Sequence, residues 1–152
     1  YEGGIRVPLI VRWPDHVSPG SVCEPPVISD DFLPALTEMA GLAQPGNRDA
    51  VSLVPPLSES GSLERRTLYW HYPHRHKDGA GPSGAVREGD LKLIEFFEDG
   101  RRELYHTGKD IGETKNLLET EPDIAKRLHA VLANWRTQVK APMPTRKNGG
   151  TQ

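Results

Sequence analysis

The densest group of titratable side chains in this sequence is His71, His74 and His76, with Arg75 beside the last two. Imidazole and guanidinium groups can donate hydrogen bonds to anionic oxygens and to hydroxyl groups. The group begins in an aromatic-rich run at residues 68–72, passes Pro73 and enters a glycine-rich stretch. These four residues are therefore candidate substrate-binding side chains at the end of a strand.

Two other interpretations of the same group stay open. Three histidines without a cysteine partner or a fixed loop spacing match a zinc site poorly, and we predict no metal site. The group can also be a solvated strand end. We expect Tyr69, Trp70 and Tyr72 to pack in the core or on a sheet face. Because side chains alternate along a strand, His71 should then point away from the layer that holds Trp70 and Tyr72.

Composition excludes several classes of function. The chain has 152 residues, of which 36% are hydrophobic and 26% charged, as in an ordinary globular domain. A net charge of -2 without a basic stripe argues against a nucleic-acid partner. The longest apolar run, at residues 7–11, is far too short for a membrane span, so we expect no membrane partner. The single Cys23 cannot form an internal disulfide.

The first part of the chain predicts elements of an α/β domain. Residues 7–13 are nearly continuously apolar, which is typical of a central strand covered on both faces. Such a strand needs neighbours that this chain does not supply, which indicates a piece of a larger sheet. Asp31 is placed to cap a helix over residues 32–40, with Pro34 in its first turn. Leu33, Leu36 and Met39 would form its apolar face.

The second part predicts a meander of three or four antiparallel strands. Apolar runs at residues 68–72, 85–87, 91–97 and 102–105 are separated by a flexible stretch and by two turns that pair acidic residues with Gly89 or Gly100. A helix should follow at about residues 122–139, with Thr120 and Asp123 as a capping box. An apolar stripe would bury it against the sheet: Ile124, Leu128, Val131, Leu132, Trp135 and Val139. We expect residues 146–152 to be a disordered tail.

Six stretches, in this order, resemble the carboxy-terminal third of formylglycine-dependent sulfatases of the arylsulfatase type. Y-E-G-G-I-R-V-P-L-I-V-R-W-P at residues 1–14 is similar to the stretch that follows the family's active-site lysine, and residues 27–34 resemble the opening of its next helix. L-Y-W-H-Y-P-H at residues 68–74 looks like a histidine-rich strand end of many bacterial members, where this region reaches the mouth of the active site. Residues 85–94, 103–105 and 110–117 resemble the carboxy-terminal sheet and a D-x-G-E-x-x-N-L loop.

The resemblance implies the fold class and the domain organisation. We expect an α+β/α/β fragment of a sulfatase, in which residues 1–66 are the incomplete tail of the catalytic α/β domain. Residues 67–145 would form a small antiparallel sheet of three or four strands packed by the carboxy-terminal helix. The remainder of the catalytic domain is then the expected partner of this chain.

The resemblance also implies the function. The parent protein would be a sulfuric ester hydrolase of the periplasm or the extracellular space, acting on a sulfated small molecule or saccharide with calcium and a formylglycine residue. A phosphodiesterase or phosphonate hydrolase of the same superfamily is the alternative enzyme. A non-catalytic carbohydrate- or protein-binding domain is the alternative of another class.

Departures from the family pattern predict that the isolated chain is inactive. Cys23-Glu24-Pro25-Pro26 imitates the start of the family's C-x-P-S-R nucleophile motif, but Pro26-Val27 stand where Ser-Arg are needed. The metal cluster and the lysine lie upstream in the family, so we expect no catalytic residue and no cofactor in this chain.

Several other side chains have expected roles. Arg6 is expected to form a structural ion pair, with a substrate contact as the alternative. Asp110, Glu113 and Asn116 should make loop hydrogen bonds. If the histidines face the active-site mouth, His71 and His74 should lie at the same edge as residues 1–6.

Overall fold

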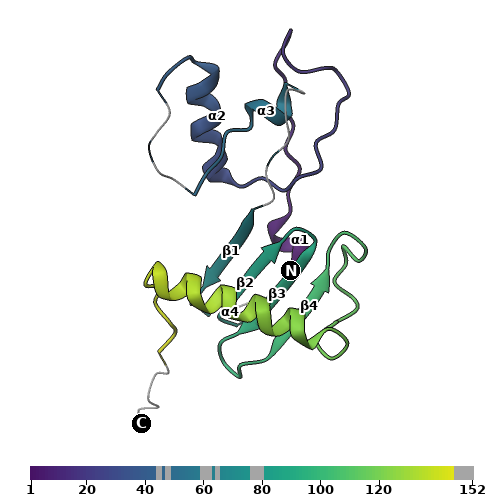
Figure 1. The fold of residues 1–152 in the computed structure, drawn as a ribbon, viewed down its shortest axis with the longest axis vertical. Coiled ribbons are helices and arrows are strands. Elements are labelled where there is room, and N and C mark those ends of the chain that lie inside the picture. Colours follow the sequence, from purple (N-terminus) through teal and green to yellow (C-terminus); the bar gives the residue numbers. More distant parts are fainter. Residues whose placement is uncertain (44–45, 47–48, 59–62, 64–65, 76–80, 146–152) are drawn as a thin grey trace. The chain divides into compact units, whose positions relative to one another are not determined.

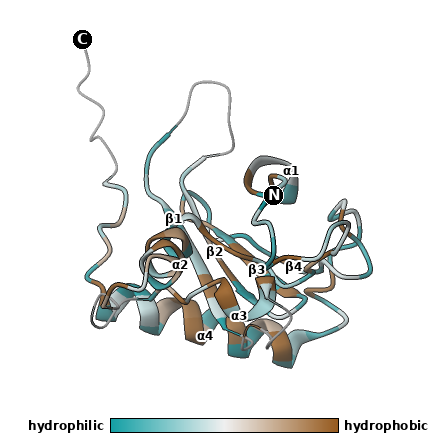
Figure 2. Cartoon of the chain, turned by 90° about the horizontal axis from the view of Figure 1, so that it is seen from above, coloured by the Kyte–Doolittle hydropathy of each residue, from teal (hydrophilic) through white to brown (hydrophobic). Residues whose placement is uncertain are grey.

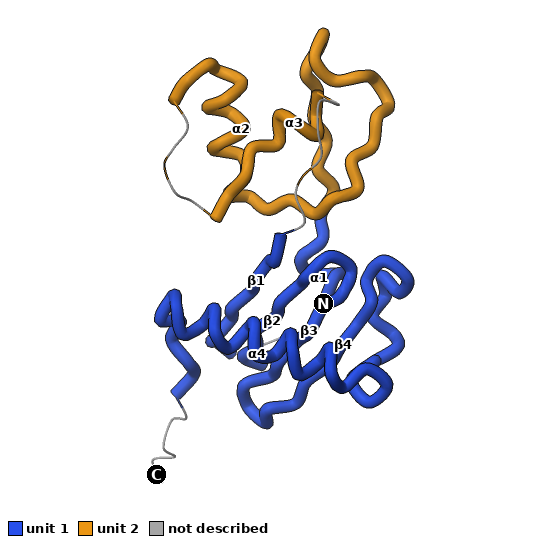
Figure 3. The backbone as a smooth tube through the Cα atoms, in the orientation of Figure 1, with its two compact units in different colours: residues 1–7, 66–152 blue, residues 8–65 orange. Residues whose placement is uncertain are grey.

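The computed structural model describes residues 1–43, 46, 49–58, 63, 66–75 and 81–145. The chain forms two compact units, shown in Figure 3: Tyr1–Val7 together with Arg66–Gln152, and Pro8–Arg65 between them. The first seven residues therefore belong with the sheet, whereas the sequence-based division assigns them to the catalytic domain. Each unit is described by itself.

The first unit contains a four-stranded antiparallel meander, as predicted. Its strands are β1 (Thr67–Tyr72), β2 (Ser83–Glu88), β3 (Leu91–Phe96) and β4 (Arg102–His106), in the spatial order β1-β2-β3-β4 (Figure 1). Gly89 and Gly100 occupy the two acidic turns with φ of 60° and 72°. These backbone angles strain any residue with a Cβ atom, which explains the glycines.

Helix α4 (Pro122–Gln138) covers one face of this sheet and confirms the predicted stripe. Leu128 and Leu132 are fully buried against a set of strand residues: Val86, Leu93 and Leu104. Trp135 stacks on Tyr69 with ring centroids 4.7 Å apart.

The predicted ends of α4 need two corrections. The Thr120 hydroxyl donates to the Leu117 carbonyl, and no described side chain caps the helix, so the predicted capping box does not form. Val139 lies beyond the last turn and is exposed, so the buried stripe ends at Trp135.

The opposite face of the sheet carries a second apolar cluster and the first residues of the chain. The cluster consists of Ala85, Ile94, Phe96 and Tyr105, with Trp70 packed against it. The short helix α1 (Glu2–Ile5) lies on this face, so that α1 and α4 stand on opposite sides of the sheet (Figure 2).

The second unit contains η1 (Ser29–Asp31), α2 (Phe32–Met39) and α3 (Val54–Leu57). Helix α2 starts at the predicted residue, but Asp31 does not cap it. The Asp31 carboxylate instead accepts hydrogen bonds from the N–H groups of Ile28 and Val51, at 2.9 and 3.0 Å. Its two oxygens tie the start of α2 to a loop twenty residues away.

The predicted apolar face of α2 is not the buried one. Leu33 is exposed and Leu36 is 62% exposed, whereas Pro34 and Ala35 are buried.

The predicted strand at residues 7–13 is absent from the described structure. Val7 and Ile10 are 79% and 90% exposed, and all the described strands belong to the meander. A central strand is stable only when its backbone groups pair with neighbours on both sides, and the described residues provide none. Among the described helices, none has the length and apolar character required to cross a bilayer.

Candidate functional site

His71, the first of the predicted substrate-binding residues, is held inside the first unit. Its Nε2 atom lies 2.7 Å from the Pro142 carbonyl oxygen, and its ring centroid lies 5.3 Å from that of Phe97 and 6.4 Å from that of Trp135. Its Nδ1 atom is buried and has no hydrogen-bond partner among the described residues. In this arrangement neither ring nitrogen is free to bind a ligand.

The alternation predicted around His71 is confirmed, with one correction. Trp70 packs in the cluster on the α1 side of the sheet, and His71 points to the α4 side. The prediction assumed one buried layer. Because both faces of this sheet are covered, His71 points into the end of the α4 layer rather than into solvent.

His74 and Arg75 lie beyond the end of β1, and both are exposed. The His74 ring meets the Tyr72 ring edge-on, with centroids 5.8 Å apart. Arg75 forms an ion pair with Glu98, and its side chain remains 75% exposed. His76 lies outside the described residues. His74 and Arg75 thus keep free hydrogen-bonding capacity at the surface.

A small cavity of about 130 Å³ adjoins the Glu98 end of this pair. It is lined by Gly81, Pro82, Phe96, Glu98, Asp99 and Arg101. The Arg101 guanidinium lies over the Phe96 ring, 3.8 Å from its centroid. The lining combines two acidic side chains with one cation, so it does not define an anion site by itself.

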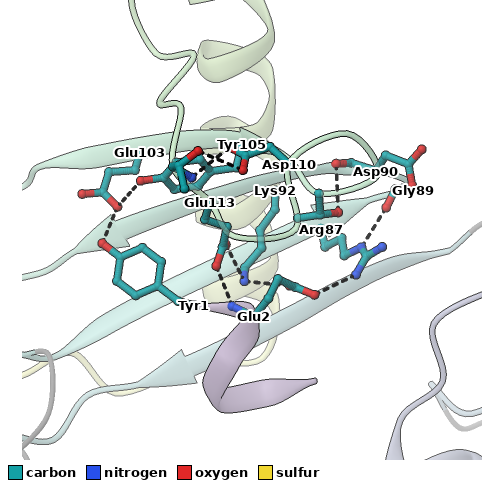
Figure 4. Close-up of polar contacts among 12 residues, drawn as sticks. Tyr1, Glu2, Arg87, Gly89, Asp90, Lys92, Glu103, Tyr105, Asp110 and Glu113 are labelled. Atoms are coloured by element: carbon teal, nitrogen blue, oxygen red, sulfur yellow. Dashed lines mark hydrogen bonds and ion pairs between the residues drawn. The ribbon is translucent and has the colours of Figure 1, made fainter. Parts of the chain in front are cut away.

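A set of buried charged side chains lies elsewhere in this unit, around Glu2 (Figure 4). Lys92 is 1% exposed, and its Nζ lies 2.9 Å from Glu2 Oε1 and 2.9 Å from Glu113 Oε1. The Glu2 N–H donates to Glu113 Oε2 at 2.6 Å, and Arg87 Nη1 lies 3.4 Å from Glu2 Oε2. Two cations and two carboxylates therefore balance in a buried site. We call these four residues the charge clasp: Glu2, Arg87, Lys92 and Glu113.

Tyr1 is fixed by a separate polar contact on β4. Its hydroxyl donates to Glu103 Oε2 at 2.6 Å, and the Tyr105 hydroxyl donates to the same oxygen at 3.0 Å. Arg101 pairs with the other oxygen of Glu103. Burial, and then the hydrogen bond to Glu103, raise the pKa of Tyr105 far above its usual value. Tyr105 therefore stays a hydroxyl donor at any ordinary pH.

Sequence reasoning missed the charge clasp. Lys92 was expected only as a member of a strand, and Glu113 only as a loop residue. Arg6, which was expected to form an ion pair, is exposed and has none among the described residues. The available signal was Lys92 itself, a cation between Leu91 and Leu93 in a half-apolar strand. Such a residue becomes buried only if carboxylates from elsewhere reach it.

The other predicted loop residues behave as expected. Asp110 accepts hydrogen bonds from the N–H groups of Thr114 and Lys115, both at 2.8 Å. Asn116 Oδ1 accepts from the N–H groups of Leu104 and Leu118, both at 3.0 Å. The hydrogen bond between Leu104 and Asn116 therefore attaches the loop after β4 to that strand.

His71 lies apart from the first residues of the chain, whereas histidines at the active-site mouth were expected to share an edge with residues 1–6. His71 pairs with Gly84 toward one end of the sheet and faces α4. Lys92, which holds Glu2, pairs with Arg87 toward the other end and faces α1. His71 therefore shares neither an edge nor a face with Tyr1–Ile5.

The described residues contain no group of three or more His, Cys, Asp or Glu side chains arranged to hold a metal ion. A calcium ion prefers six to eight oxygen ligands, so the described side chains do not fit one. Cys23, the residue in the imitation of the nucleophile motif, is an exposed free thiol.

Comparison with known proteins identifies the architecture as that of a sulfatase. Residues 1–138 match the family model described as N-sulphoglucosamine sulphohydrolase, C-terminal. The chain belongs to this family, and its four-stranded sheet with α4 is the carboxy-terminal segment of a sulfatase. A curated sulfatase of Formosa agariphila is 34% identical over 159 residues, which cover 93% of this chain and 29% of the relative. The chain thus spans less than a third of that relative's length.

Two solved structures are also similar. A protein in complex with its substrate D-glucosamine-2-N,6-O-disulfate is 26% identical, has a TM-score of 0.69, and is matched over 91% of this chain and 30% of its own. A phosphonate monoester hydrolase from Silicibacter pomeroyi has a TM-score of 0.62 over 84% of this chain and 28% of its own. At 23% identity it shows the shared fold alone.

Proposed function

We propose that this chain is the carboxy-terminal segment of an enzyme that hydrolyses sulfate esters of carbohydrates. The observation that carries this proposal is the family match across residues 1–138, which extends through both units. The relative bound to a sulfated glucosamine supports a saccharide substrate, because its identity of 26% extends over 91% of this chain. A periplasmic or extracellular location follows from the family resemblance.

The catalytic groups themselves belong to the remainder of the enzyme. Sulfate ester hydrolysis needs a nucleophile, positive charge on the sulfate oxygens and an acid for the leaving alcohol. The formylglycine and calcium that the resemblance implies find no fitting side chains among the described residues. We therefore derive no chemical step from this chain and assign it a role in binding and support.

For substrate contact we propose His74 and Arg75, together with His76. The support is that His74 and Arg75 are exposed donors at the end of β1, and that the ion pair of Arg75 among the described residues is with the half-exposed Glu98. His71, which the sequence also offered as a contact, would act by holding Pro142 at the end of β1. A sulfate group accepts several charge-assisted hydrogen bonds, and such bonds are stronger than neutral ones.

The second unit, Pro8–Arg65, is proposed to pack against the rest of the catalytic domain. Seven of its large apolar side chains are exposed in this chain: Leu9, Ile10, Val22, Phe32, Leu33, Leu36 and Leu42. Such a surface is stabilised when another part of the protein removes it from water.

The test is an assay of the full-length protein on a 6-sulfated glucosamine, an aryl sulfate and a phosphonate monoester. We expect sulfate release, and a fall in kcat/KM of about tenfold to a hundredfold in His74→Ala and in Arg75→Ala, since each loses one or two charge-assisted hydrogen bonds. His16→Ala is the matched control, because His16 is also an exposed histidine. Thermal stability should change little in all three variants.

Three outcomes would contradict parts of this proposal. Faster hydrolysis of the phosphonate would favour the alternative enzyme class. Binding of a sulfated oligosaccharide without turnover by the full-length protein would favour a binding module. Turnover by the isolated chain that disappears in Cys23→Ala would show that the catalytic groups lie here after all.

A further inference from the structure

Helix α1 is attached to the sheet mainly by charge rather than by apolar contact. It has four residues, and Glu2 is the only buried one, while Ile5 is 39% exposed. Glu2 is buried because Lys92 and Arg87 neutralise its carboxylate and Glu113 accepts its N–H. A buried carboxylate without such partners would be strongly unfavourable.

A helix of this length has no stability of its own. The conformational entropy lost when a helix nucleates outweighs the free energy gained from one turn of hydrogen bonds. Short helices therefore exist only where tertiary contacts hold them. At the ends of α1, Gly4 N–H donates to Tyr1 O and Arg6 N–H donates to Glu2 O. The position of Tyr1–Ile5 therefore depends on the charge clasp, with the Tyr1–Glu103 hydrogen bond as a second attachment.

The charge clasp also fixes the orientation of Tyr1–Ile5 on the sheet. Glu2 contacts a cation from β2 through one oxygen, a cation from β3 through the other, and a carboxylate from the loop after β4 through its N–H. These three contacts come from three separate segments and are all directional, whereas an apolar contact tolerates sliding and rotation. Buried polar groups of this kind can specify one arrangement even where they add little stability.

The charge clasp lies where it can position the remainder of a sulfatase. The matched family is carboxy-terminal, and the chain spans 29% of its curated relative. The greater part of such a protein therefore precedes the residue that aligns with Tyr1. Its polypeptide reaches the sheet unit at Tyr1 and Glu2, and the charge clasp determines where and in which direction it arrives.

We propose that the charge clasp holds the preceding polypeptide in register with the sheet unit, and that Lys92 is a positioning residue for the sulfatase site. This inference rests on the proposed function. Lys92 acts through Glu2 and touches no substrate. Small displacements of reacting groups lower the rate of the chemical step far more than they weaken binding, so its loss should reduce kcat with little effect on KM.

The experiment compares three variants of the full-length protein. Lys92→Met removes the central cation, and Glu2→Gln keeps the shape and the backbone N–H while removing the charge. Lys126→Met is the matched control, because Lys126 is an exposed lysine on α4. Backbone amide hydrogen exchange is measured over residues 3–6 and over β3, and kcat and KM are measured on an aryl sulfate well below the unfolding temperature.

We expect exchange at residues 3–6 to be about a hundredfold faster or more in Lys92→Met, since it removes the cation that Glu2 and Glu113 share and leaves Glu2 with Arg87 alone. Glu2→Gln should give a smaller acceleration, and Lys126→Met none. The amides of β3 should stay protected in all three variants. In Lys92→Met, kcat should fall at least tenfold with KM within about twofold.

Each contrary result has its own meaning. Unchanged exchange at residues 3–6 in both Lys92→Met and Glu2→Gln refutes the charge clasp. Faster exchange with an unchanged kcat refutes the positioning role. If the wild-type protein releases no sulfate, the proposed function fails and the positioning role fails with it, while the exchange data still decide whether the charge clasp holds α1.

Discussion

Replacement of Leu128 by alanine should remove a large part of the stability of the sheet unit. Leu128 is fully buried in the middle of α4 and packs against Val86, Leu93 and Leu104, which are also fully buried. The strands beneath it are held in place by the sheet and cannot collapse into the cavity that alanine leaves. Similar Leu→Ala replacements cost about 3 to 5 kcal/mol, and we expect about 3 to 4 kcal/mol here.

This cost is large for a unit of this size. A domain of roughly 90 residues has a free energy of unfolding of about 5 to 14 kcal/mol. Each kcal/mol shifts Tm by about 4 to 8 °C for such a domain. Leu128→Ala should therefore lower Tm by roughly 12 to 30 °C.

Urea unfolding followed by circular dichroism measures this free energy directly. Val139→Ala at the end of α4 is the control, because Val139 is an apolar residue of the same unit but is half exposed. Its cost should stay within about 0.5 kcal/mol. A Leu128→Ala cost below about 1 kcal/mol, or one equal to that of Val139→Ala, would refute the packing of α4 on the sheet.

Two further predictions concern polar contacts in the same unit. Desolvation acts to raise the pKa of Glu95, but hydrogen bonds from Arg136 and His129 outweigh it, so its folded-state pKa lies below the ordinary value. The stabilisation by Glu95 is thus complete above the unfolded-state pKa of about 4.3 and is lost as pH falls through the folded-state pKa. Urea titrations from pH 7 to pH 3 should therefore show a shallower acid loss for Glu95→Gln than for wild type, and parallel curves would contradict the assignment. Asn116→Ala removes the acceptor of two backbone N–H groups and should cost about 1 to 2 kcal/mol in urea unfolding. The exposed Asn134→Ala is its control, and equal costs for the two variants would show that the Asn116 bonds do not stabilise the loop.

The sheet and α4 could be predicted from the sequence because their signals are local. Turns that contain Gly89 and Gly100 separate short half-apolar runs. The apolar residues before and after Leu128 recur at helical spacing. Each of these patterns is complete within about twenty residues. The family resemblance was also visible as an ordered set of motifs, and the match across residues 1–138 confirms it.

The features that could not be predicted depend on partners far away in the sequence. Asp31 was expected to cap α2. Its carboxylate oxygens instead accept hydrogen bonds from the N–H groups of Ile28 and of Val51, which lies twenty residues further on. Lys92 was expected to be an ordinary strand residue, but its carboxylate partner Glu2 is 90 residues away. Residues 7–13 were expected to form a strand, but a strand also needs neighbours, and its sequence cannot supply them. The roles of His74 and Arg75 in substrate binding stay predictions.

The separation of the charge-clasp residues along the chain has a consequence for biosynthesis. The meander joins neighbouring segments, so its contacts are local and can form quickly once β4 and α4 are available. Glu2, by contrast, is synthesised 90 residues before Lys92 and 111 residues before Glu113. At about 5 to 20 residues per second, its carboxylate remains without these partners for roughly 5 to 20 s.

During that interval the charge clasp cannot hold α1, because Lys92 and Glu113 are still missing. The last step in folding of the sheet unit is then the binding of Tyr1–Ile5, which is synthesised early, to the newly formed sheet. A ribosome that pauses or terminates before Glu113 is added leaves Glu2 with an incomplete set of partners. Nascent chains of this protein are therefore open to proteolysis around Tyr1–Ile5 until Glu113 has been made.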